Sequence, residues 1–194
     1  MSRPAAERAV VIAASAGGLD AISIVLGGLR AGFAAPVLAL LHSAAGASTL
    51  LSELLARRCR LPVTEARAGM QVRGGEVYLA PSDYHLLVER DGRLALNVDD
   101  KVSFVRPSAD VLFASAAEVW RQHLVGVVLT GSNHDGAAGM QAVRMHRGQS
   151  VIQDPASAAH PEMPRAACGR PGEDVILPLA QIAPHLNQWD VRHE

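Results

Sequence analysis

The apolar run Ala9-Val10-Val11-Ile12-Ala13-Ala14 passes directly into the turn Ser15-Ala16-Gly17-Gly18 near the start of this sequence. Every residue of the run is apolar, which is typical of a strand that is covered on both faces. An apolar stripe at helical spacing follows the glycines, at Leu19, Ile22, Ile24, Val25, Leu26 and Leu29. A strand that turns through glycines straight into a helix predicts a parallel sheet covered by helices.

Two further apolar runs repeat this pattern. The run at residues 37–41 is followed by a helical pattern at 48–57. The run at 125–130 lies between helical patterns at 108–122, where Ser108 or Asp110 is the expected cap, and at 137–146. These three runs predict the centre of the sheet.

The remaining patterns are shorter. Asp91-Gly92 is a hairpin turn signal between two of them. Strands are expected at 77–80, 85–89, 93–98, 151–153 and 175–177, and a last helix at 179–187, with 187–194 as a loose tail. The predicted fold class is therefore α/β, a doubly wound and mostly parallel sheet flanked by helices with a β-hairpin insertion. We expect one domain over residues 1–194, with its core at about 8–187.

Composition excludes several classes of protein. The 194 residues are 49% hydrophobic and carry a formal net charge of −1, so no basic field favours binding to nucleic acid. Cys59 and Cys168 are too few for a disulfide framework or a four-ligand zinc site, and the histidines lack paired ligand spacing. The N-terminus lacks the features of a signal peptide, and no apolar stretch is long enough to span a membrane. We expect a cytoplasmic protein with no bound metal and no direct membrane insertion.

Three polar residues follow the three predicted central strands: Ser15, His42 and Asp135. In open α/β sheets, ligands bind beyond the carboxyl ends of the strands. A serine nucleophile, a histidine base and an aspartate that orients the histidine form a hydrolytic triad. Each residue also has a structural interpretation, because Ser15 and Asp135 are good helix caps and His42 suits the end of a strand. His134, beside Asp135, is a candidate accessory group.

Two other motif interpretations fail on spacing. The turn after the first run lacks both GxGxxG and GxxxxGK[ST], so a nucleotide site is not supported. The lipase-type GxSxG elbow is also absent around Ser15, and the order Ser15, His42, Asp135 differs from that of α/β-hydrolases.

Several segments in one collinear order resemble the catalytic domain of the chemotaxis receptor methylesterase family, CheB. The resemblance runs from about Arg8 to Leu186. Its most specific pieces are Arg106-Pro107-Ser108-Ala109-Asp110-Val111-Leu112-Phe113 and Thr130-Gly131-Ser132-Asn133-His134-Asp135-Gly136-Ala137-Ala138-Gly139-Met140. It is carried also by Val11-Ile12-Ala13-Ala14-Ser15-Ala16-Gly17-Gly18, Leu41-His42, Val77-Tyr78-Leu79-Ala80-Pro81 and Met163-Pro164-Arg165.

The resemblance implies a protein-glutamate methylesterase that acts through an acyl-enzyme, with Ser15 as nucleophile, His42 as base and acid, and Asp135 orienting His42. It implies deamidation of receptor glutamines as a second activity, no cofactor, and methylated chemoreceptor helices as partners, with other signalling proteins as further candidates. The candidates for the oxyanion hole and the pocket are Ala16, Gly17, Gly131, Ser132 and Asn133.

The sequence departs from the family pattern close to the triad. The family commonly has Ser-Thr-Gly-Gly where Ala16 stands here, Met-Pro after the histidine, and Thr-Gly-Met-Gly where this chain has Thr130-Gly131-Ser132-Asn133. Val105 replaces a histidine. The altered loops motivate an alternative function, a weak or inactive homologue that binds receptors. Only a few residues precede the first run, so we expect a standalone catalytic domain without the receiver domain that many family members carry.

Overall fold

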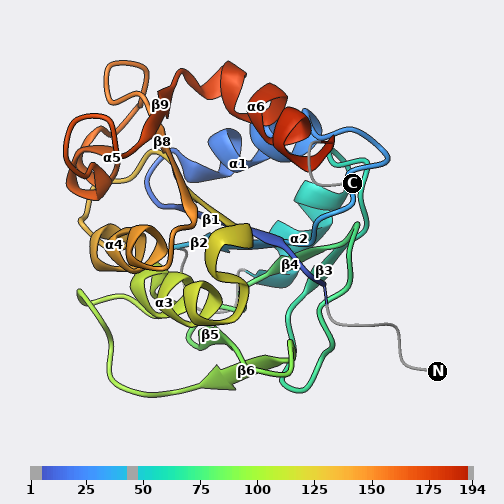
Figure 1. The fold of residues 1–194 in the computed structure, drawn as a ribbon. Helices are drawn as coiled ribbons and strands as arrows, with labels where there is room; N and C mark the ends of the chain where they lie inside the picture. Colours follow the sequence, from blue (N-terminus) through green and yellow to red (C-terminus); the bar gives the residue numbers. More distant parts are fainter. Residues whose placement is uncertain (1–5, 43–47, 192–194) are drawn as a thin grey trace.

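The fold is built on a seven-stranded sheet in a computed structural model that describes residues 6–42 and 48–191 (Figure 1). The strand order is β3-β4-β2-β1-β7-β8-β9, and all neighbouring strands are parallel. The strands are β1 (Ala9–Ala14), β2 (Val37–Leu41), β3 (Val63–Glu65), β4 (Val77–Leu79), β7 (Leu124–Val128), β8 (Gln149–Gln153) and β9 (Val175–Leu177). The predicted parallel sheet is confirmed.

Helices cover both faces of the sheet (Figure 1). One face packs against α1 (Gly18–Gly27), α2 (Ser48–Ala56) and α6 (Leu179–Val191). The other packs against α3 (Ala109–Trp120), α4 (Ala137–Met145), α5 (Glu162–Ala167) and the hairpin of β5 (His85–Val88) and β6 (Leu94–Asn97). The one-turn 3-10 helix η1 (Arg121–His123) joins α3 to β7.

Strand β1 shows why the apolar runs form the centre. Val10, Ile12 and Ala14 belong to the core on one face, and Val11 and Ala13 belong to the core on the other. Alternate side chains point to opposite faces of a strand, so a strand that is buried twice needs an apolar residue at every position. The doubly wound arrangement is therefore confirmed.

Two short elements were not predicted. Strand β3 has three residues and lies at the sheet edge, where two of its side chains are partly buried and the third is exposed. Helix α5 has six residues and contains Pro164. Strand β3 has one apolar residue in three, and the six residues of α5 make fewer than two helical turns, so neither shows a hydrophobic pattern of its own. Contacts with the rest of the fold must determine them.

The prediction of a loose tail from residue 187 is wrong as far as residue 191. Helix α6 continues to Val191, and Asp190 is completely buried. Its carboxylate accepts hydrogen bonds from the backbone N–H groups of Ala34 and Ala35, at 2.8 and 3.0 Å. It also pairs with Arg30 at 2.6 Å and with Arg8 at 3.3 Å. These contacts extend the helix beyond its sequence pattern; residues 192–194 lie outside the described residues.

We expect Asp190→Ala to lower the free energy of unfolding by about 3 kcal/mol, because it leaves buried N–H groups and arginines without their carboxylate. Urea denaturation of the native and variant proteins measures the change. Asp20→Ala is the matched control, because within the described residues the exposed Asp20 pairs with the exposed Arg58, at 3.8 Å. Its loss should cost less than about 1 kcal/mol. Equal effects of the two substitutions would contradict this account of the C-terminal helix.

Candidate active site

The ends of three adjacent strands bring the predicted residues to one edge of the sheet. In the parallel pair of β1 and β2, Ala14 is the partner of Leu41, so Ser15 and His42 leave the sheet at the same register. The His42 N–H donates to the carbonyl of Ala14 at 3.1 Å. Asp135 lies in the loop after β7, the strand on the other side of β1. This is the edge at which α/β sheets bind ligands.

His42 and Asp135 form a buried pair. Nε2 of His42 lies 2.8 Å from Oδ2 of Asp135. The Asp135 side chain is fully buried, and that of His42 is 9% exposed. A buried carboxylate that holds one nitrogen of an imidazole leaves the other nitrogen to exchange a proton with a reactant.

The start of α3 fixes the Asp135 carboxylate. Oδ1 of Asp135 accepts the hydroxyl of Ser108 at 2.7 Å and the backbone N–H of Asp110 at 3.2 Å, and Oδ2 accepts the backbone N–H of Ala109 at 2.6 Å. Burial by itself raises the pKa of Asp135, but the hydrogen bonds from His42, Ser108 and Ala109 outweigh it and hold that pKa below its ordinary value of 3.8. The partial positive charge of a helix N-terminus acts in the same direction. Asp135 is thus held as an anion.

Ser108 and Asp110 have roles that the sequence did not predict. Neither side chain caps α3; the Ser108 hydroxyl binds Asp135, and Oδ1 of Asp110 accepts the N–H groups of Gly136 and Gly139 at the start of α4, at 2.9 and 2.7 Å. Burial raises the pKa of Asp110, and the nearby charge of Asp135 adds to this effect. Asp135, which precedes α4, therefore binds the start of α3, and Asp110, which lies in α3, binds the start of α4. The polar positions of the distinctive segment at 106–113 were the available signal.

The alternative roles of Ser15 and Asp135 as helix caps are not observed. The residues at the cap positions of α1 and α4 are Gly17 and Gly136, and neither helix has a side-chain cap. Gly17 has φ 72°, a left-handed conformation that glycine adopts without strain. The Ser15 N–H donates to the carbonyl of Thr130 at 3.0 Å, which joins this turn to the loop that carries Asp135.

The hydrogen bond that a triad predicts between Ser15 and His42 is not formed. Within the described residues, the Ser15 hydroxyl has no hydrogen-bond partner, and Nδ1 of His42 faces Nδ2 of Asn133 at 3.1 Å instead. In a neutral imidazole the unprotonated nitrogen has one lone pair, so Nδ1 can accept from only one donor at a time.

The structure separates the candidates for an oxyanion hole. The Gly131 N–H donates to the carbonyl of His160 at 3.0 Å. The prediction that Gly131 donates to the oxyanion is therefore wrong in this structure, because its N–H is already bound. Its contribution is space, because a Cβ there would lie 2.9 Å from Cβ of Ser15. The N–H groups of Ala16, Gly17, Ser132 and Asn133 make no hydrogen bond within the described chain. They remain candidates.

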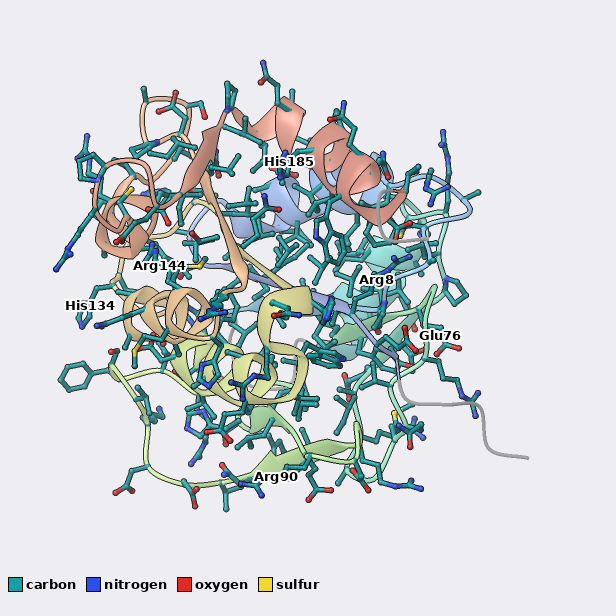
Figure 2. The ribbon with its side chains drawn as sticks, viewed as in Figure 1. Arg8, Glu76, Arg90, His134, Arg144 and His185 are labelled. Carbon is teal, nitrogen blue, oxygen red and sulfur yellow. The ribbon has the colours of Figure 1, made fainter. Side chains whose placement is uncertain are left out.

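Other predicted features lie outside this arrangement. His134 is exposed and lies at the periphery of the molecule, away from Arg8 and Glu76 (Figure 2). Its side chain makes no hydrogen bond to the described residues, which gives no support to an accessory role. In residues 6–42 and 48–191, no helix is long and apolar enough to cross a membrane, and no group of three His, Cys, Asp or Glu side chains is placed to hold a metal.

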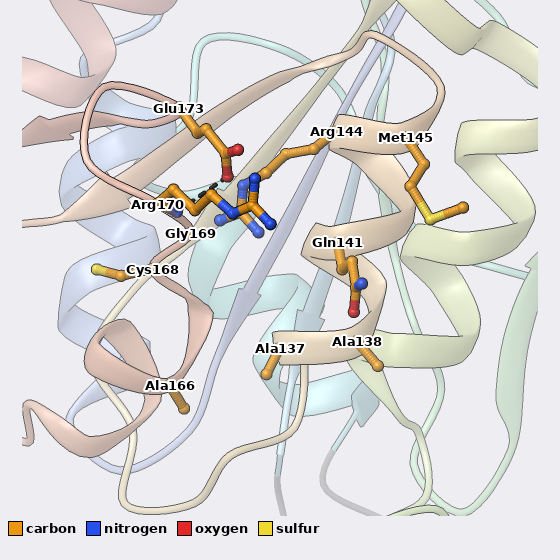
Figure 3. Close-up of a pocket in the computed structure, with 10 residues that line it drawn as sticks. All are labelled: Ala137, Ala138, Gln141, Arg144, Met145, Ala166, Cys168, Gly169, Arg170 and Glu173. Carbon is orange, nitrogen blue, oxygen red and sulfur yellow. Dashed lines mark hydrogen bonds between the residues drawn. The ribbon is translucent and has the colours of Figure 1, made fainter.

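A hollow of about 710 Å³ lies between α4 and the segment that follows α5 (Figure 3). It begins at Ala137, two residues beyond Asp135, and includes none of the three triad residues. Arg144 pairs with Asp174 at 2.6 Å, and the carboxylate of Glu173 accepts the backbone N–H of Arg170 at 2.9 Å.

The lowered pKa of Asp135 predicts a loss of stability in acid. The stability that ionised Asp135 contributes is present above 3.8, its ordinary pKa, and is lost as the pH falls through the lower folded-state value. Urea denaturation of the native protein and Asp135→Asn, from pH 7 to pH 2, measures this contribution. We expect their difference in unfolding free energy to be constant above about pH 5 and to shrink below about pH 4. A difference that does not change across this range would contradict the assignment.

Comparisons with known proteins show which family this chain resembles. A family model described as CheB methylesterase matches residues 10–186. A Cupriavidus metallidurans protein named protein-glutamate methylesterase/protein-glutamine glutaminase 2 is 43% identical over 183 residues, which cover 94% of this chain and 54% of that protein. A Leptospira interrogans relative is 38% identical over 175 residues, which cover 90% of this chain and 91% of the relative.

The fold has a solved counterpart as well. The CheB methylesterase catalytic domain of Thermotoga maritima superimposes with a TM-score of 0.89 at 30% identity, and the match covers 94% of this chain and 98% of that domain. The family model, both relatives and the solved domain each match most of this chain. The chain belongs to the CheB methylesterase family.

Proposed function

We propose that this chain is a cytoplasmic protein-glutamate methylesterase that hydrolyses glutamate methyl esters on the helices of chemoreceptors, with deamidation of receptor glutamines as a second reaction of the same site. One observation carries the proposal: the buried pair of His42 and Asp135, 2.8 Å apart, stands beside Ser15 at the ligand-binding edge of the sheet. The names of the relatives support the substrate class.

In the proposed reaction, Oγ of Ser15 attacks the ester carbonyl, and Nδ1 of His42 takes the hydroxyl proton because Nε2 is bound to Asp135. The negative charge that develops on the carbonyl oxygen is stabilised by backbone N–H groups, for which Ala16 is the nearest candidate in sequence to Ser15. The tetrahedral intermediate collapses, His42 returns the proton to the leaving methoxide, and methanol departs. The glutamyl group is then esterified to Ser15.

Water completes the cycle. His42 removes a proton from the water as it attacks the acyl-enzyme, and the same proton returns to Oγ of Ser15 when the glutamate leaves. The sum is ester plus water giving carboxylic acid plus methanol. With a glutamine side chain, the leaving group is ammonia. Throughout, the anionic Asp135 stabilises the positive charge that His42 carries in the transition states.

Hydrolysis is favoured over a receptor-binding module by the cost of the site. The Asp135 carboxylate is buried, which is costly, and it accepts four hydrogen bonds, one of them from His42. This arrangement holds the imidazole in one tautomer, which hydrolysis requires and receptor binding does not.

Mass spectrometry of receptor peptides tests the proposed substrate class. Methylated chemoreceptor membranes are incubated with the native protein, and the modified positions are read before and after. We expect glutamyl methyl esters to become carboxylates, and some glutamines to become glutamates. If every position keeps its original mass while the protein is folded, the substrate assignment is wrong.

A further inference from the structure

We propose that Asn133 is a positioning residue that restrains the base of this site, so that Ser15 is activated only after the Asn133 amide leaves His42. The inference rests on the proposed function, because it takes His42 as the base for Ser15. It concerns a different step, the conversion of a resting arrangement into the reactive one.

The orientation of the Asn133 amide follows from its two contacts. The backbone N–H of Asp135 donates to Oδ1 of Asn133 at 3.1 Å, and an N–H group needs an oxygen there. The other end of the amide, Nδ2, therefore faces Nδ1 of His42 at 3.1 Å and donates to it. Nδ1 must then be unprotonated, and the ring proton lies on Nε2, facing Asp135. Both ends of the amide are in use.

This arrangement competes with the reaction. The lone pair on Nδ1 is the acceptor that the Ser15 hydroxyl needs, and the hydroxyl itself has no partner within the described residues. Two donors cannot share one lone pair in good geometry. Ser15 therefore donates its proton only when the amide has moved.

Protonation of His42 also disrupts its contact with Asn133. Once Nδ1 carries a proton, it faces the NH2 of Asn133, donor against donor. A rotation that brings Oδ1 to His42 relieves this, but it turns the NH2 toward the N–H of Asp135. Every arrangement in which His42 acts as a base thus breaks a hydrogen bond of Asn133. The net loss of one hydrogen bond corresponds to about five- to tenfold in rate.

The rate at which a fluorophosphonate labels Ser15 tests this restraint without the receptor. We expect Asn133→Ala to be labelled about five- to tenfold faster than the native protein. The pH of half-maximal labelling should also rise in this variant, because the amide donor stabilises only unprotonated His42 and its removal makes protonation easier. His134→Ala is the matched control, since His134 is the exposed neighbour and should leave both quantities unchanged.

A second variant separates restraint from a purely structural role. Asn133→Asp keeps an oxygen for the Asp135 N–H, so the loop contact survives, but its other oxygen accepts a hydrogen bond from His42, whereas the Asn133 amide donates one. We expect slower labelling at pH 7 and a half-maximal pH above that of Asn133→Ala. A residue that only supports the loop would give native labelling in this variant.

The opposite results would overturn the proposal. They are slower or unchanged labelling of Asn133→Ala with thermal unfolding like that of the native protein, native behaviour of Asn133→Asp, or no labelling of Ser15 in any variant. Failure of the proposed function looks different. A native protein that is labelled at Ser15 but converts no receptor ester has another substrate, and the labelling rates still decide the role of Asn133.

Discussion

Replacing Ser15 by alanine is expected to lower turnover of receptor methyl esters by on the order of 10⁴-fold or more, because no nucleophile remains to form the acyl-enzyme. Stability should change little. The Ser15 hydroxyl has no hydrogen-bond partner within the described residues, so its removal leaves no group unsatisfied and the unfolding free energy should stay within about 0.5 kcal/mol. Turnover is measured with saturating methylated membranes, and stability by urea denaturation.

Ser157→Ala is the control for this substitution. Ser157 is exposed in the loop after β8, and its hydroxyl donates only to the carbonyl of Asp154. Native turnover is expected there. If Ser15→Ala retained native turnover, another residue would be the nucleophile.

The second large effect is expected at Asp135. Asp135→Asn should reduce turnover by about 10⁴-fold, because an amide no longer fixes His42 in the reactive tautomer or stabilises its positive charge. It should also lower the free energy of unfolding by about 3 kcal/mol or more. Each oxygen of Asp135 accepts a backbone N–H, from Ala109 or Asp110, so the NH2 of the new side chain must face a donor whichever way it turns.

Asp110→Asn is the matched control for this substitution. Oδ1 of Asp110 accepts the N–H groups of both Gly136 and Gly139, so a single amide oxygen can take its place. Burial and the nearby charge of Asp135 raise the pKa of Asp110, so the environment disfavours its ionised form and a neutral amide should cost less there than at Asp135. Equal losses of stability in the two variants would mean that the network around Asp135 is not what holds α3 and α4 together.

The centre of the sheet could be predicted from the sequence because its requirement is local. A strand that is buried on both faces needs apolar residues throughout, and β1, β2 and β7 have them. Placing Ser15, His42 and Asp135 at strand ends then follows from the rule that parallel strands share one carboxyl edge. The last turns of α6 could not be predicted, because the partners of Asp190 include Ala34 and Arg30, which lie 156 and 160 residues away in the chain.

The arrangement around the triad depends on contacts between distant segments. Ser108 looked like a helix cap, yet its hydroxyl reaches Asp135, 27 residues away. Asn133 is a pocket candidate by its place in the sequence, but no sequence pattern indicates that its amide contacts His42, 91 residues away. Gly131 was expected to donate, and its N–H is taken by His160 in the segment before α5. Side-chain orientation at such sites is set by tertiary packing, which a sequence pattern does not record.

Methanol release from methylated chemoreceptor membranes tests the central claim most directly. The native protein and Ser15→Ala are compared at equal concentration, with circular dichroism to confirm that both are folded. We expect the native protein to release methanol and the variant to release none above background. Equal release by the two proteins, or none from the folded native protein, would contradict it.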